Sequence, residues 1–240
     1  ISRKIYRWYS LAAAILIIPL LIGGAIWVMN SPQPESVVAE KPVQSKIIAP
    51  LGSRINFTLP DGTEGWLNSG SSLSYQIPFN HNRQLELTGE AWFSVEKDEE
   101  HPFEVHAANS KVKVLGTQFN MNAYPEEKYV EVVLEEGKVA FNAPGMAGAL
   151  ELKPDERLVY TSDSINIATT EPYKYSSWKE GKLIFRGDPM AEVARRIERW
   201  YNVEVELVDQ ELEDNMIRGV FQDDSLDEVC KYLAMTSPIR

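Results

Sequence analysis

The feature that most constrains this chain is an apolar run, residues 11–29, with the sequence LAAAILIIPLLIGGAIWVM. It contains no charged side chain, and as a helix its 19 residues would extend roughly 28 Å, close to the hydrocarbon thickness of a bilayer. Trp8, Tyr9 and Trp27 lie near its ends, where aromatic rings favour the lipid headgroups. The alternative is a cleaved signal peptide, whose apolar region is usually shorter, about 7–15 residues. The run therefore predicts a single transmembrane helix.

Charge is distributed unevenly on the two sides of this run. The chain has 24 Lys and Arg against 35 Asp and Glu, a net charge of −11, yet residues 1–10 hold three cations and no acid. The positive-inside rule therefore places residues 1–10 in the cytoplasm and the chain beyond residue 29 in the periplasm, anchored in the inner membrane. The acidic body excludes nucleic-acid binding, because it repels phosphate. Since the first residue is Ile1 and not Met, we expect a further cytoplasmic portion before it.

The exported part starts with a linker and continues as short alternating runs. Residues 30–46 contain three prolines and little periodicity, and are predicted to be extended. Residues 47–172 alternate apolar and polar side chains in around a dozen short stretches ended by turn residues, such as Pro60-Asp61-Gly62. The single cysteine excludes an internal disulfide. This pattern predicts an all-β module, and it leaves a sandwich and a solenoid equally open.

The pattern changes in residues 173–240, which predict a small α+β module of order β-α-β-β-α. Residues 182–186 alternate as a strand, and Asp188 is predicted to cap a helix with Pro189 at its first position. Residues 203–207 and 217–221 are predicted strands, and Ser225 with Glu228 forms a capping box for a second helix. Cys230 is predicted to be a core thiol of that helix. We expect a closing strand after residue 240, so that the module is truncated here.

No catalytic or metal-binding constellation is recognisable in the sequence. The three histidines (His81, His101 and His106) lack metal-ligand spacing and are predicted to be solvated. The acidic pairs at residues 126–127 and 135–136 are predicted to be solvated turns. No cofactor, no metal and no enzymatic activity are therefore expected.

Several blocks resemble the FecR family: DGTEGWLNSGSSLSY (61–75), LTGEAWFSVEKDEEHPFEVHA (87–107), KVKVLGTQFNMNAY (111–124) and VVLEEGKV (132–139). Residues 178–207 are similar to the C-terminal module of Bacteroidetes-type members, which is itself similar to the secretin and TonB N-terminal domain. The resemblance implies a transmembrane anti-sigma factor. A cytoplasmic domain, absent here, would bind an extracytoplasmic-function (ECF) sigma factor. The periplasmic part would receive a signal from an outer-membrane TonB-dependent transducer.

The resemblance also points to one place where a reaction could occur. Gly116-Thr117 aligns with a Gly-Thr step at which some relatives are cleaved, and attack of the Thr117 hydroxyl on the Gly116 carbonyl would begin such a reaction. The alternative, which we favour, is a glycine that permits a bulge between strands.

We expect the C-terminal module to bind its partner by strand addition at an exposed edge. The candidate edge residues are Val203, Val205, Leu207, Ile217, Val220 and Phe221. A rival hypothesis is a membrane-anchored glycan-binding or scaffold protein, in which Trp66, Trp92 and Trp178 would provide stacking faces for sugars.

Overall fold

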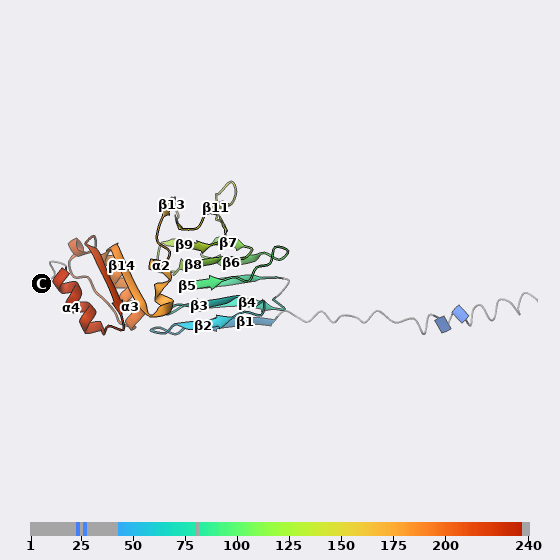
Figure 1. Ribbon diagram of the computed structural model, residues 1–240, viewed down its shortest axis with the longest axis horizontal. Coiled ribbons are helices and arrows are strands. Elements are labelled where there is room, and N and C mark those ends of the chain that lie inside the picture. Colours follow the sequence, from blue (N-terminus) through green and yellow to red (C-terminus); the bar gives the residue numbers. More distant parts are fainter. Residues whose placement is uncertain (1–22, 25, 28–42, 80–81, 237–240) are drawn as a thin grey trace, which may run out of the picture. The chain divides into compact units, whose positions relative to one another are not determined.

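The computed structural model describes residues 23–24, 26–27, 43–79 and 82–236 (Figure 1). The chain divides into two compact units, residues 1–41 and 42–240. The predicted cytoplasmic flank, and all of the predicted membrane segment but four helical residues, lie outside the described residues. In the described part of the chain, no helix is both long and apolar enough to cross a bilayer.

The second unit begins with an all-β module, as predicted. Its strands in the described residues are β1 (Val43–Ile48), β2 (Ile55–Thr58), β3 (Glu64–Leu67), β4 (Ser72–Ile77), β5 (Gln84–Ser94), β6 (Phe103–Ala107), β7 (Ser110–Val114), β8 (Gln118–Ala123), β9 (Tyr129–Glu136), β10 (Val139–Asn142), β11 (Leu150–Leu152), β12 (Glu156–Thr161) and β13 (Ile165–Thr169). The last residues of the predicted linker, 43–46, belong to β1, because they pair with residues 74–77 of β4.

The strands form two sheets that share β5. Sheet A has the order β1-β4-β5-β6-β7-β10-β11, and sheet B has the order β2-β3-β5-β8-β9-β12-β13. The first half of β5 pairs in sheet A and the second half in sheet B, with Gly89 near the crossing. The chain forms a hairpin in one sheet and then a hairpin in the other, and it advances along both (Figure 1). The module thus combines two facing sheets, as in a sandwich, with the steady advance of a solenoid.

The two sheets enclose one hydrophobic core. Its centre is a group of buried aromatic rings, in which Phe93 of sheet B contacts Phe103 of sheet A with ring centroids 5.8 Å apart. Phe93 also stacks on Phe119 at 5.2 Å and meets the ring edge of Phe57 at 6.0 Å. These are the inward positions of the alternating runs, so period-two alternation accounts for the core.

The C-terminal module follows as α2 (Tyr173–Ser176), η1 (Ser177–Glu180), β14 (Lys182–Pro189), α3 (Met190–Tyr201), η2 (Gln210–Leu212), β15 (Met216–Gln222) and α4 (Leu226–Thr236). β14 and β15 form an antiparallel pair. Both helices contribute to a second core that contains Phe185, Val193, Ile197, Phe221 and Val229. The predicted strand over residues 203–207 is wrong as a paired strand, since no strand is assigned there and the segment has no ladder partner.

The two predicted caps had different outcomes. The capping box is confirmed, since the Ser225 N–H donates to Glu228 Oε2 at 2.8 Å and the Glu228 N–H donates to Ser225 Oγ at 3.4 Å. The cap by Asp188 is wrong, because its side chain is buried and forms an ion pair with Lys174. Carbonyls of residues 213 and 215 instead accept from the first backbone N–H groups of α3.

Cys230 is exposed, so the predicted core thiol is wrong. The inward stripe of α4 consists of Leu226, Val229 and Leu233, at i, i+3 and i+7. Cys230 follows Val229 by about 100° around the helix, which turns its side chain away from the core.

Candidate functional site

The outer face of sheet B is polar but buried. Asn120 is 1% exposed, and Asn122 and Glu131 on the same face are also buried. Their neighbours on the strands, such as Phe119 and Met121, point into the β core. A sheet with one free face would leave these polar side chains in water. Here α2, η1 and α3 contribute the groups that cover them.

Glu90 of β5 lies at the centre of this covered face. Its carboxylate accepts hydrogen bonds from Asn68 Nδ2 at 2.7 Å and from Asn120 Nδ2 at 2.8 Å. Trp178 Nε1 of η1 donates to Asn120 Oδ1 at 3.2 Å, which connects the C-terminal module to this carboxylate through one amide. Burial raises the pKa of Glu90, and the hydrogen bonds from Asn120 and Asn68 oppose that rise. The contact between the two modules therefore has at its centre a partly buried carboxylate that two amides hydrogen-bond.

A second contact joins α3 to the turn between β8 and β9. Arg199 Nη2 lies 2.6 Å from Glu127 Oε1, and its Nη1 lies 3.5 Å from Glu126 Oε1. The guanidinium also lies over the Tyr124 ring, 4.1 Å from its centroid. Burial lowers the pKa of Arg199, whereas the neighbouring Glu127 carboxylate raises it, and the pKa is raised overall. The prediction of a solvated turn at residues 126–127 is wrong for Glu127, because α3 covers it.

Further contacts extend this junction along the sheet. Arg157 of β12 forms an ion pair with Glu131 of β9 and lies 5.2 Å from the centroid of the Tyr175 ring in α2. Burial raises the pKa of Glu131 to about 7, against the lowering effect of Arg157. We call these contacts, from Glu90 to Arg199 and Arg157, the module junction.

The same junction covers two of the three tryptophans proposed as sugar platforms. Trp178 is 2% exposed. Lys179 Nζ lies over the Trp92 ring, 3.6 Å from its centroid, and burial lowers the pKa of this ammonium group. Trp66 is half-buried and pairs with Trp92 across the strands. These contacts remove most of the surface on which the glycan-binding hypothesis depended.

The structure separates the six predicted edge residues into three groups. Ile217 and Phe221 are buried in the core of the C-terminal module. Val220 of the same strand is 62% exposed. The other three are partly buried side chains that pack against that core: Val203, Val205 and Leu207.

Gly116 and Thr117 lie in the turn before β8. A Cβ on Gly116 would come within 2.9 Å of Lys97 Cα, so close packing accounts for the glycine. Thr117 Oγ1 donates to the Lys138 carbonyl at 3.0 Å, and the register between β8 and β9 shifts at Gln118. This geometry agrees with the bulge interpretation, and it gives the hydroxyl a structural partner.

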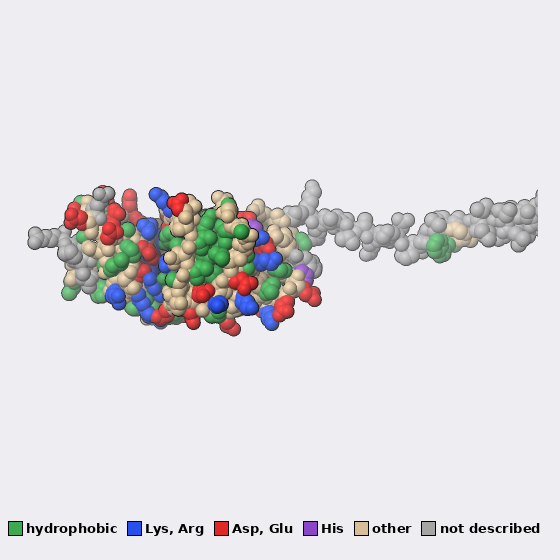
Figure 2. Space-filling model, turned by 90° about the horizontal axis from the view of Figure 1, so that it is seen from above, with side chains coloured by type: hydrophobic (Ala, Val, Ile, Leu, Met, Phe, Trp, Pro, Cys, Tyr) green, Lys and Arg blue, Asp and Glu red, His purple; other side chains and the backbone are tan. Residues whose placement is uncertain are grey.

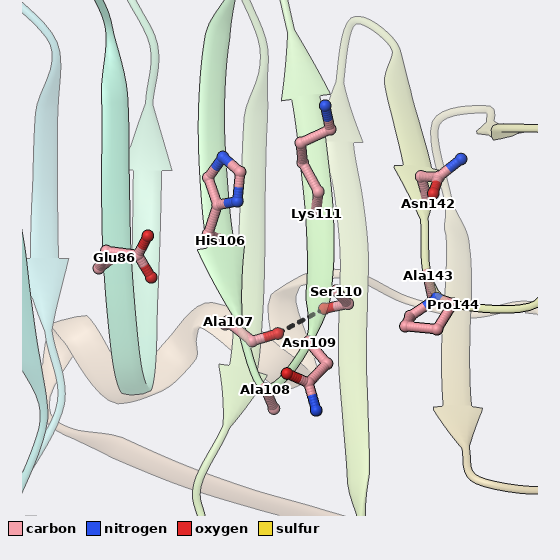
Figure 3. Close-up of a pocket in the computed structure, with 10 residues that line it drawn as sticks. All are labelled: Glu86, His106, Ala107, Ala108, Asn109, Ser110, Lys111, Asn142, Ala143 and Pro144. Carbon is pink, nitrogen blue, oxygen red and sulfur yellow. Dashed lines mark hydrogen bonds between the residues drawn. The ribbon is translucent and has the colours of Figure 1, made fainter.

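A polar groove of about 510 Å³ crosses β5, β6, β7 and β10 (Figure 3). Glu86, His106 and Lys111 project side by side from neighbouring strands into it. The Ser110 hydroxyl at its floor donates to the Ala107 carbonyl at 2.7 Å and is therefore engaged. Among the described residues, no three His, Cys, Asp or Glu side chains are placed to hold a metal ion. The groove shows no paired nucleophile and base.

The described residues thus form a small α+β module docked on the polar face of a β-module. Two family models match the chain, one in each module: "FecR protein" over residues 45–140 and "FecR, C-terminal" over residues 182–240. The chain belongs to the FecR family and is an anti-sigma regulator.

Solved structures agree with this assignment. A crystal structure, at 1.65 Å, of a proposed anti-sigma factor from Parabacteroides distasonis ATCC 8503 is 33% identical, with a TM-score of 0.76. The match covers 82% of this chain and 93% of that chain. A second crystal structure with the same description, at 2.50 Å, gives the same values. A search of curated proteins found no match.

Proposed function

We propose that this chain relays a signal from an outer-membrane TonB-dependent transducer to a cytoplasmic ECF sigma factor. Its C-terminal module would receive the signal in the periplasm, and residues 11–29 would connect that part to the cytoplasm. The proposal is supported by membership of an anti-sigma family and by the apolar run with cations on one side only. The inner membrane is the location that this topology requires.

The observation that carries the proposal is the module junction. A domain that receives a signal must be coupled to the rest of the chain. Here α3 and η1 contact the β-module through buried charges. Arg199 and Glu127 are both largely enclosed, with side-chain exposures of 11% and 0%. Separating them would leave a charge without compensation in a water-poor site. The junction therefore favours two states, docked and released, over a graded movement.

Release of the C-terminal module would offer a direct route across the membrane. A single helix transmits small shifts poorly, whereas a released module exposes new backbone to a protease in the periplasm. Cleavage there followed by cleavage within residues 11–29 would free the cytoplasmic part. Gly23, Gly24 and Pro19 in that run have low helix propensity, which assists intramembrane cleavage.

The first test is a binding assay between the full chain, in detergent, and purified N-terminal signalling domains of TonB-dependent transducers from the same cell. We expect at least one domain to bind, and transducers that lack this domain to be inactive as controls. Binding of oligosaccharides without binding of any signalling domain would favour the glycan-binding hypothesis instead.

The second test is a reporter gene transcribed by the cognate sigma factor. In cells that carry Arg199→Ala, we expect reporter output to depart from its uninduced level without inducer, since the junction is weakened. Arg195→Ala, on the same helix, is the matched control: its side chain is 38% exposed and lies farther from Glu127, at 4.0 Å, so the output should change less. If the two variants gave identical reporter output, the junction would have no role in signalling.

A further inference from the structure

The C-terminal module has three stretches of backbone to which a partner strand could add, and the backbone groups of the first are already hydrogen-bonded. On the outer edge of β14, the Ile184 carbonyl accepts from Arg196 Nη1 at 3.2 Å. The Arg186 N–H on the same edge donates to Asp188 Oδ2 at 2.6 Å. Side chains of the module therefore occupy the groups that strand addition needs.

The outer edge of β15 is capped at both ends. The Tyr232 hydroxyl of α4 donates to the Arg218 carbonyl at 2.8 Å, and the Gln222 N–H donates to Asp224 Oδ2 at 2.8 Å. Alternate residues of a strand point their backbone groups to the same edge, so Val220 is left between two caps. A partner strand would have to displace both caps to pair here.

The third stretch, residues 203–207, has the side-chain pattern of a strand but no strand partner. Its burial alternates with a period of two, with apolar side chains against the module core and the side chains of Glu204 and Glu206 exposed. The side chains of residues 203–207 therefore alternate as the sequence predicts, and only the hydrogen bonds to a neighbouring strand are absent.

The backbone of this stretch also alternates. The N–H of Val203 donates to the Glu198 carbonyl at 3.2 Å, and the N–H of Val205 donates to Glu198 Oε1 at 3.0 Å. These bonds direct the N–H groups of Val203 and Val205 toward the end of α3, so the backbone groups of Glu204 and Glu206 point to the opposite side. Within the described residues, those N–H and C=O groups have no hydrogen-bond partner.

The charge around this open edge selects a partner. Residues 203–214 contain six acids and neither Lys nor Arg. Figure 2 shows acidic side chains gathered on the C-terminal module, at the left end of the molecule. Opposite charges on facing strands stabilise pairing, and like charges destabilise it. A strand with Lys or Arg on its outer face therefore fits this edge, and an acidic strand is repelled.

We propose that residues 203–207 are an unpaired strand that binds a β-strand of the partner protein, one that carries Lys or Arg at alternate positions. This proposal rests on the proposed function, since it makes the receiving module the acceptor and names the segment and the partner chemistry. Backbone hydrogen bonds of Glu204 and Glu206 supply the affinity, and their carboxylates supply the selectivity.

The test compares variants of the full chain for binding to the transducer signalling domains. Glu206→Pro removes one outward N–H and breaks no bond within the described residues. We expect about tenfold weaker binding, or more, because one hydrogen bond is lost and the proline ring obstructs the edge. The double variant Glu204→Lys, Glu206→Lys should weaken binding similarly. Its matched control, Glu211→Lys with Glu213→Lys, makes the same charge change off the edge and should change binding less than threefold.

The outcomes separate this proposal from the proposed function. If the wild-type chain binds a signalling domain and Glu206→Pro binds equally well, the edge is refuted and the relay stands. Equal weakening by the two double variants would show that net charge alone matters, which also refutes the edge. Self-association of the chain that Glu206→Pro abolishes would assign the edge to a second copy and overturn the proposal.

If no signalling domain binds, the proposed relay is refuted. A peptide probe then tests residues 203–207 as an edge for strand addition. The probe is the heptapeptide Thr-Lys-Val-Lys-Val-Lys-Thr, with Thr-Glu-Val-Glu-Val-Glu-Thr as its acidic control. The basic peptide should slow amide hydrogen exchange at Glu204 and Glu206, and the acidic one should not. Protection at β15 instead, or no protection at either place, would overturn the proposal.

Discussion

Truncation of Arg199 is the sharpest test of the junction. In Arg199→Ala the Glu127 carboxylate, whose side chain is fully enclosed, loses the guanidinium 2.6 Å away. Breaking a buried pair by removing one partner typically costs 3–5 kcal/mol, because the remaining charge is uncompensated. Arg195 Nε lies 4.0 Å from the same carboxylate and relieves part of this cost. We therefore expect a loss of about 3 kcal/mol from the free energy of unfolding.

The assay is urea unfolding of the full chain in detergent, monitored by tryptophan fluorescence. Trp178 and Trp200 lie at or near the junction, so the C-terminal module should unfold at lower urea than the β-module in the variant. Limited proteolysis should then cut the segment between β13 and β14 more rapidly.

Two controls make this prediction refutable. Arg195→Ala removes the more distant and more exposed of the two cations beside Glu127, at 4.0 Å, and should cost less, about 1 kcal/mol. Adding Glu127→Gln to Arg199→Ala should restore part of the loss, because it removes the stranded charge. An Arg199→Ala variant no less stable than Arg195→Ala, or no recovery in the double variant, would refute the reasoning.

Three further outcomes are expected from the same unfolding assay. The pKa of Glu131 is near its ordinary 4.5 in the unfolded chain and about 7 in the fold, so its protonation stabilises the fold below pH 4.5. This contribution, at most about 3 kcal/mol, is lost as the pH rises through 7, and Glu131→Gln should remove that part of the pH dependence. Gly65→Ala should cost about 3 kcal/mol, since its Cβ would lie 2.4 Å from Phe57 Cζ, whereas Gly148→Ala, with nothing within 4 Å, should be neutral; equal costs would contradict the packing argument. Phe93→Ala, at a fully buried ring among three others, should cost about 3–5 kcal/mol, and a loss under 1 kcal/mol would contradict the described core.

The β core could be predicted residue by residue, whereas the path of the chain could not. Alternation assigns Phe93, Phe119 and Phe141 to the inner face, and all three are buried. A period of two says nothing about which strand lies beside which, since every strand has the same period. The parallel pairing of β5 with β6 and the sharing of β5 between two sheets are consequences of tertiary packing.

The junction was missed because its partners are distant in sequence. Glu127 has the local pattern of a surface turn, and its partner Arg199 lies 72 positions later. One signal was present: α3 has three arginines on its polar face in a chain of net charge −11, which is a pattern suited to an acidic surface. For residues 203–207 the predicted alternation of side chains is correct. The predicted strand pairing is not, because alternation does not specify a neighbouring strand.

Glu90 is adjacent to Gly89, where β5 passes from one sheet to the other. A Cβ at Gly89 would lie 2.3 Å from Ser71 Oγ, so this crossing point is tightly packed and has no room to yield. Glu90 therefore lies on the same continuous strand as the half of β5 that pairs in sheet A. β5 thus makes the docked face of sheet B and the remote half of the β-module parts of one backbone, joined at a glycine that tolerates no larger side chain.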